Sequence, residues 1–135
     1  QMLSYAATVG LAQRYAETKS VKVDLSATPR KYRLFGNSLI GYSHGEKEGK
    51  RLEGLMQIEA PELWGKSVFR EFHMGHLHTE STVTKNGIVF RRISAITAPD
   101  AWHVENGFIG SVRQAQAFMW DKGRGLQAIL NSNVR

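Results

Sequence analysis

The stretch Val-Phe-Arg-Glu-Phe-His-Met-Gly-His-Leu-His, residues 68–78, decides the fold. Its first part, residues 68–72, alternates in the manner of a β-strand. Successive side chains of extended backbone point to opposite sides, so His76 and His78, two residues apart, are expected to face the same pocket. Gly75 is expected to let the chain turn at the strand end and to let a ligand approach the backbone.

A second histidine lies at the end of another predicted strand. In the run Leu-Ile-Gly-Tyr-Ser-His-Gly, residues 39–45, His44 follows the predicted strand and Gly45 comes next. Two strand ends that each pair histidine with glycine predict a metal pocket at a sheet edge. The alternative for any lone histidine is a surface or core residue. We expect His73 to be structural or adjacent to the site, and His103 to face substrate, support the site or simply pack.

The remaining sequence predicts a mixed α/β fold dominated by antiparallel pairing. Helices are expected over residues 2–17 and 49–64, the second interrupted at Ala60 because the residue before a proline avoids helical backbone. A short strand is expected over residues 21–25, and residues 100–110 are expected to form a loop. Turn signals predict three hairpins, with strands over residues 31–35 and 38–42, 81–85 and 88–93, and 114–120 and 126–130. A helix over residues 111–120 is the alternative to the last hairpin.

The composition limits the number of domains and the types of metal ligand that the chain can offer. The chain has 135 residues, a length that suits one domain, and a net charge of +6. It has no cysteine, so a metal site must use histidine, carboxylate, amide or backbone oxygen ligands. No window approaches 18 consecutive apolar residues, and no secretory signal precedes the first predicted helix, so we expect no membrane span and a cytoplasmic location.

The histidine motifs carry a resemblance to a known family. Tyr42-Ser-His44-Gly-Glu, followed about thirty residues later by the run from Phe72 to His78, is similar to the C-terminal half of the calcineurin-like metallophosphoesterases. Residues 100–103 and 107–110 resemble the phosphoesterase or DNA-repair exonuclease branch of bacteria and phages. The resemblance implies part of a β-sandwich flanked by helices, in a bacterial or phage-infected cell.

The resemblance also implies a site. It makes His44 and His76 ligands of one divalent metal ion and His78 a ligand of a second. Imidazole ligands suit Mn, Fe, Zn or Ni better than Mg or Ca. The implied reaction is metal-assisted hydrolysis of a phosphoester, with DNA or RNA among the substrates. Further residues are expected around the metals, in contact with ligands or substrate: Gly45, Gly75, Asp100 and His103.

Several family motifs are absent from the chain. It lacks the early D-x-H, the G-D-x-x-D and the G-N-H-D motifs, and its three aspartates are Asp24, Asp100 and Asp121. We therefore expect residues 1–135 to form a single partial domain that lacks the N-terminal half and contains no catalytic residue. Alone it should bind one metal weakly and show no appreciable turnover. Its expected partners are the missing half or a second copy, through an exposed sheet edge.

A rival function follows from the charge. A basic chain favours anionic partners, and a small nucleic-acid-binding module without catalysis would explain it. The histidines would then be incidental or would hold one structural zinc ion. A steep salt dependence of binding, and a loss of affinity on changing Arg91 or Arg92, would identify such a module.

Overall fold

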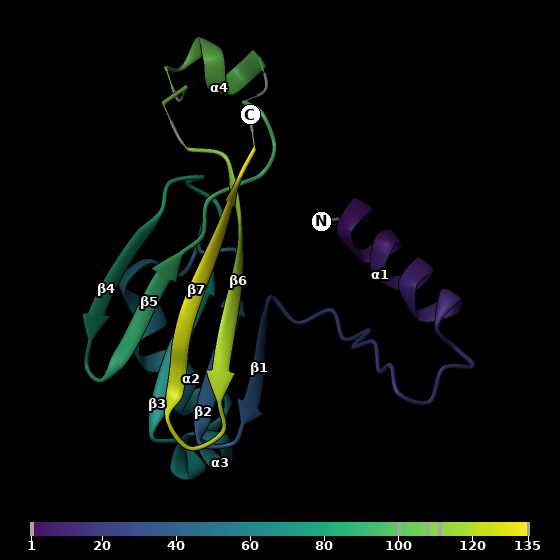
Figure 1. Ribbon diagram of the computed structural model, residues 1–135, viewed down its shortest axis with the longest axis vertical. Coiled ribbons are helices and arrows are strands. Elements are labelled where there is room, and N and C mark those ends of the chain that lie inside the picture. Colours follow the sequence, from purple (N-terminus) through teal and green to yellow (C-terminus); the bar gives the residue numbers. More distant parts are fainter. Residues whose placement is uncertain (1, 100, 108, 111, 135) are drawn as a thin grey trace.

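The computed structural model describes residues 2–99, 101–107, 109–110 and 112–134, and the side chains of these except Met2, Leu3, Trp102 and His103. Figure 1 shows the elements in space. The helical elements are α1 (Met2–Arg14), the 3-10 turn η1 (Gly49–Arg51), α2 (Leu52–Glu59), α3 (Pro61–Lys66) and α4 (Ala101–Glu105). The strands are β1 (Arg30–Phe35), β2 (Ser38–Ser43), β3 (Phe69–Met74), β4 (Ser81–Lys85), β5 (Ile88–Arg92), β6 (Gln114–Asp121) and β7 (Gly125–Asn133).

The main sheet is mixed. Its strand order is β1-β2-β3-β5-β4, with β2, β3 and β5 parallel at the centre and the antiparallel strands β1 and β4 at the edges. Parallel neighbours need a crossover, and the segment from η1 to α3 supplies it between β2 and β3. The carboxyl ends of three central strands therefore meet at one edge of the sheet.

The apolar core lies between this sheet and α2. Phe72 is fully buried, with ring centroids 5.9 Å from Tyr32 and 5.8 Å from Phe90. Met56 of α2 is also fully buried. Gly41 leaves room for this packing, because a Cβ there would lie 2.5 Å from Cε1 of Phe72.

The β6–β7 hairpin lies across the opposite face of the sheet (Figure 1). A Cβ on Gly125 would lie 2.9 Å from Phe69 of β3, and the Phe118 ring centroid is 4.5 Å from that of His73. The hairpin tip is fixed by Asn37, whose backbone N–H donates to Lys122 O at 2.9 Å. The two faces give a layered α/β/β arrangement, with α1 standing away from the sheets (Figure 1).

Most predicted elements are confirmed. The mixed α/β fold and all three hairpins are present, and the last hairpin is a strand pair rather than a helix. Ala60 interrupts the second predicted helix with φ −135°, as Pro61 requires. The first helix ends at Arg14, three residues earlier than predicted.

Two predictions are wrong. Residues 21–25 form no strand: within the described residues no strand pairs with them, and the Asp24 carboxylate accepts from the Ser26 N–H at 2.9 Å, a local bond that competes with strand pairing. Residues 101–105, expected in a loop, form the short helix α4; Gly107, with φ 77°, turns the chain just after it. The parallel pairing of β2 with β3 was not predicted either, since nothing local in the sequence encodes it.

Candidate metal centre

The candidate site lies where β2 and β3 end. Ser43, the last residue of β2, is in register with Met74, the last residue of β3. His44 and Gly75 therefore leave the sheet at the same level. This register explains why two histidines about thirty residues apart come together.

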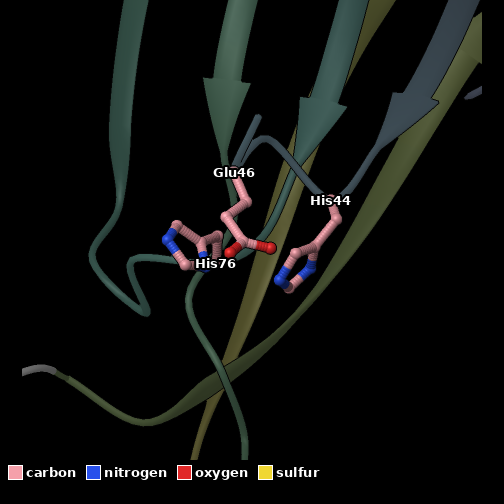
Figure 2. A group of neighbouring side chains, drawn as sticks. All are labelled: His44, Glu46 and His76. Carbon is pink, nitrogen blue, oxygen red and sulfur yellow. The ribbon is translucent and has the colours of Figure 1, made fainter. Parts of the chain in front are cut away.

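Three side chains converge beyond this edge. His44, Glu46 and His76 each offer one ligand atom, and these atoms all lie within 4.8 Å of one another. The His44 and His76 rings meet edge to face, with centroids 5.0 Å apart. Figure 2 shows the Glu46 carboxylate between the two imidazoles. His44 and Glu46 are exposed and His76 is half-buried, so the cluster is open to solvent.

The backbone that presents His76 is not extended. His76 has φ 68° and His78 has φ 53°, both in the left-handed region that side chains other than glycine seldom adopt. The Leu77 N–H donates to Gly75 O at 3.0 Å and closes a three-residue turn around His76. The expectation that the chain is extended at His76 and His78 is therefore wrong, and a pocket shared by the two histidines stays a prediction. His78 is not part of the three-residue cluster.

Two glycines lie next to the loops that carry the histidines, and one of them, Gly45, lies at a close approach. A Cβ on Gly45 would lie 3.2 Å from Cβ of Met74, and Gly45 itself has φ 84°. A Cβ on Gly75 would lie 4.0 Å from Nδ1 of His44. Both glycines thus lie beside the cluster, and their role toward a ligand remains our proposal.

His73 lies in the interior. Its ring is buried between β3 and Phe118, and its Nε2 lies 2.9 Å from Oε1 of Glu71. Arg91 Nε donates to the same carboxylate. Burial alone raises the pKa of Glu71, but the hydrogen bonds from His73 and Arg91 outweigh it and hold that pKa below its ordinary value. His73 is thus part of a buried ionic network.

Two expected residues cannot be placed in the site. Asp100 lies outside the described residues, and His103 belongs to α4 but its side chain is not described. Glu46, in contrast, belongs to the cluster although the sequence did not single it out as a ligand. Its signal was its position two residues after His44.

A cavity of about 370 Å³ opens beside the cluster. Gly45 and Met74 form its wall toward the His44, Glu46 and His76 cluster, and Leu52 and Phe90 contribute apolar surface. Three of the residues that line it are basic: Lys50, Lys85 and Arg92. Lys85 is paired with Glu53 at 3.1 Å. Two acidic residues, Glu48 and Glu53, line the cavity as well, so the basic side chains outnumber the acidic ones there by one.

No helix in the described part of the chain combines the length and the apolar character needed to cross a membrane. No family model matches the chain, and no curated protein matches it. Solved structures do resemble it. A double mutant of Vps29 from Entamoeba histolytica superposes with a TM-score of 0.51 at 12% identity, covering 83% of this chain and 65% of Vps29.

A single mutant of the same Vps29 gives a TM-score of 0.51 at 11% identity, covering 86% of this chain and 66% of that one. A conserved uncharacterized protein from Streptococcus pneumoniae, described as a predicted phosphoesterase, gives 0.40 at 13% identity, covering 96% and 91% of the two chains. This chain spans about two thirds of the length of Vps29, at 65% and 66% in the two structures. At the level of the fold, the chain is therefore similar to Vps29.

Proposed function

We propose that this chain is the metal-binding C-terminal part of a divalent-metal-dependent phosphoesterase. The observation that carries the proposal is the convergence of His44, Glu46 and His76 at the carboxyl ends of β2 and β3, in a fold shared with Vps29. Ligand sites in open α/β sheets lie at the carboxyl ends of the strands.

The donor set fits a divalent metal ion. Two imidazoles and one carboxylate suit Mn, Fe, Zn or Ni. Three protein ligands leave coordination positions open for water or a substrate oxygen. A metal ion bound there would polarise a phosphoryl oxygen and lower the pKa of bound water. The protein's part is to hold the ion and to offer positive charge, from Lys50 and Arg92, to a phosphate in the adjacent cavity.

His78 belongs to a second metal ion in this proposal. It lies two residues beyond His76 on the same loop, outside the three-residue cluster. A second ion would need further ligands, and the three aspartates of the chain stand in motifs unlike those of the family. We therefore propose that residues from an N-terminal half complete the site, and that the chain alone has no appreciable turnover.

The open sheet edges suggest how such a partner would associate. β1 and β4 are the edge strands of the main sheet, and the Tyr42 and Phe69 side chains near the hairpin face are partly exposed. Unpaired edges favour pairing with another chain. The proposal expects concentration-dependent self-association in size-exclusion chromatography, and a single monomer peak over a wide concentration range would argue against it.

The experiment that tests the function is a hydrolysis assay with bis-p-nitrophenyl phosphate and Mn²⁺. The chain alone should show no turnover above a metal blank. A longer protein, expressed with the residues encoded upstream of Gln1, should hydrolyse the diester. His76→Ala in that longer protein should remove the activity. Robust turnover by the chain alone would refute the partial-site proposal, and an inactive extended protein would refute the phosphoesterase proposal.

The net charge of +6 favours a second candidate function, a nucleic-acid-binding module without catalysis. Four of the basic side chains are engaged within the protein, because Arg30, Lys31, Lys85 and Arg91 form ion pairs with carboxylates, and a nucleic acid would have to be bound mainly by the other basic residues. Binding of a DNA oligonucleotide at several salt concentrations separates the candidates. A steep salt dependence that Arg92→Ala reduces, with no effect of His76→Ala, would favour the module.

A further inference from the structure

The loop that carries His44 and Glu46 is tied down through the residues between them. The Gly45 N–H donates to Ser43 Oγ at 3.1 Å, and Ser43 Oγ in turn donates to Glu48 Oε1 at 2.6 Å. The Lys47 N–H lies 3.2 Å from the other carboxylate oxygen, Glu48 Oε2, to which it donates. Residues 43, 45 and 47 are therefore all linked, directly or through Ser43, to the Glu48 carboxylate.

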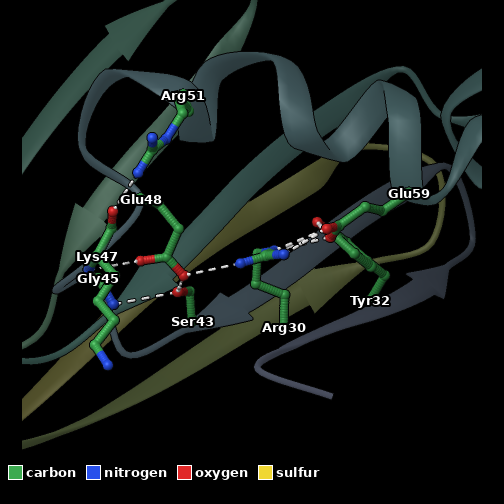
Figure 3. Close-up of polar contacts among 8 residues, drawn as sticks. All are labelled: Arg30, Tyr32, Ser43, Gly45, Lys47, Glu48, Arg51 and Glu59. Carbon is green, nitrogen blue, oxygen red and sulfur yellow. Dashed lines mark hydrogen bonds and ion pairs between the residues drawn. The ribbon is translucent and has the colours of Figure 1, made fainter.

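The Glu48 carboxylate is in turn attached to the body of the protein. Arg30 NH1 of β1 donates to Glu48 Oε1 at 3.3 Å, and Arg30 Nε donates to Glu59 Oε2 at 2.8 Å. Glu59, the last residue of α2, also accepts from the Tyr32 hydroxyl at 2.6 Å. Figure 3 shows this chain of contacts from the loop through Arg30 to α2.

Burial distinguishes this network from an ordinary surface ion pair. The Glu48 side chain is only 9% exposed and that of Arg30 19% exposed. A carboxylate that is nearly enclosed has little water to replace a lost partner, so its contacts constrain the loop. The network joins three parts of the structure: Arg30 belongs to β1, Ser43 ends β2, and Glu48 precedes η1.

We propose that Arg30, Glu48 and Ser43 are positioning residues for the metal centre. They hold the alternate residues of the loop, so that His44 and Glu46 are presented together toward His76 before a metal ion arrives. Ligands held in place in advance bind a metal ion without the cost of ordering the loop. This inference rests on the proposed function, because it assumes that these ligands bind a metal ion.

The test is a Co²⁺ titration of the full chain, followed by ligand-field absorption in the visible range. Ser43→Ala removes the hydroxyl that links Gly45 to Glu48, and Glu48→Gln removes the charge that Arg30 holds. Each should weaken Co²⁺ binding by about 10-fold or more and alter the absorption spectrum. Ser43→Thr keeps the hydroxyl on a residue suited to a strand, and should restore affinity and spectrum.

The control is Arg124→Met. It breaks the exposed pair between Arg124 and Asp121, 3.4 Å long, at the tip of the β6–β7 hairpin, and should leave Co²⁺ affinity unchanged. Far-ultraviolet circular dichroism checks that each variant is folded. If Glu48→Gln does not fold, the comparison of Ser43→Ala with Ser43→Thr decides, since it changes only one hydroxyl.

The outcomes separate the two proposals. If the wild-type chain binds no Co²⁺, the metal centre itself is refuted and the positioning role with it. If the wild type binds but Ser43→Ala has the same affinity and spectrum, only the positioning role is refuted. A loss in Ser43→Ala that Ser43→Thr reverses supports it, because a merely structural role would change stability but leave the spectrum of the folded protein alone.

Discussion

The buried network under the β6–β7 hairpin gives a quantitative prediction. Glu71 is 5% exposed, and its carboxylate accepts from Arg91 Nε and, at 2.9 Å, contacts His73 Nε2. Arg91 is itself 8% exposed, and NH1 donates to Thr82 Oγ1 at 3.0 Å. In Glu71→Gln, the Arg91 guanidinium remains buried without a countercharge.

The expected loss is large. Breaking a buried ion pair by removing one partner costs about 3–5 kcal/mol, because the remaining charge is not compensated. A domain of this size has a free energy of unfolding on the order of 5–15 kcal/mol, so Glu71→Gln should lose a large part of it. Replacing both members, in Glu71→Met with Arg91→Met, should lose less than Glu71→Gln alone, since no buried charge is left.

Urea unfolding followed by tryptophan fluorescence measures the change. The matched control is Glu53→Gln, which makes the same substitution in the exposed pair of Glu53 with Lys85, 3.1 Å long. That variant should lose less than about 1 kcal/mol. A loss in Glu71→Gln no greater than that in Glu53→Gln would refute the reasoning that burial makes this network essential.

Gly36→Ala should lower the free energy of unfolding by about 3 kcal/mol in urea unfolding, because the φ of Gly36 is 58° and a Cβ there would lie 2.0 Å from Lys122 O. Gly87→Ala should lower it by only about 1 kcal/mol, because Gly87 also has a positive φ, 73°, but faces open space. Equal losses in the two variants would contradict the close contact between Gly36 and Lys122. Because the pKa of Glu71 is lowered in the folded protein, its contribution to stability is complete above its ordinary pKa of 4.5 and is lost as the pH falls below it; carboxyl NMR that gave a pKa above 4.5 would exclude this. In Zn²⁺ titrations, His76→Ala should weaken binding of the first equivalent by at least about 10-fold while His78→Ala leaves it unchanged, and the reverse order would show that the wrong histidine was placed in the cluster.

The sequence predicted those parts of the fold that depend on local signals. Asn86 and Gly87 mark the turn of the β4–β5 hairpin, and Pro61 fixes the break between α2 and α3. The order of the strands in the sheet could not be predicted from such local signals. The parallel pairing of β2 with β3 joins residues about thirty positions apart, and it depends on packing of α2 against Phe72 rather than on any turn.

The site was predictable to the same extent. A histidine beside a glycine at each of two strand ends indicated His44 and His76, and the register of Ser43 with Met74 brings their loops together. The left-handed backbone at His76 was not predictable, because alternation assumes an extended chain. Glu46 was overlooked as a candidate ligand, since a single exposed glutamate is ordinary until the fold places it beside two imidazoles.

The most direct test of the account is an isothermal titration of the full chain with Zn²⁺, for the wild type, His44→Ala and Glu46→Gln. The account predicts one Zn²⁺ per chain in the wild type and affinity at least about 10-fold weaker in each variant, because each removes a donor from a three-ligand site. Wild-type affinity in both variants, or no binding by the wild type, would contradict the claim that His44, Glu46 and His76 form a metal centre.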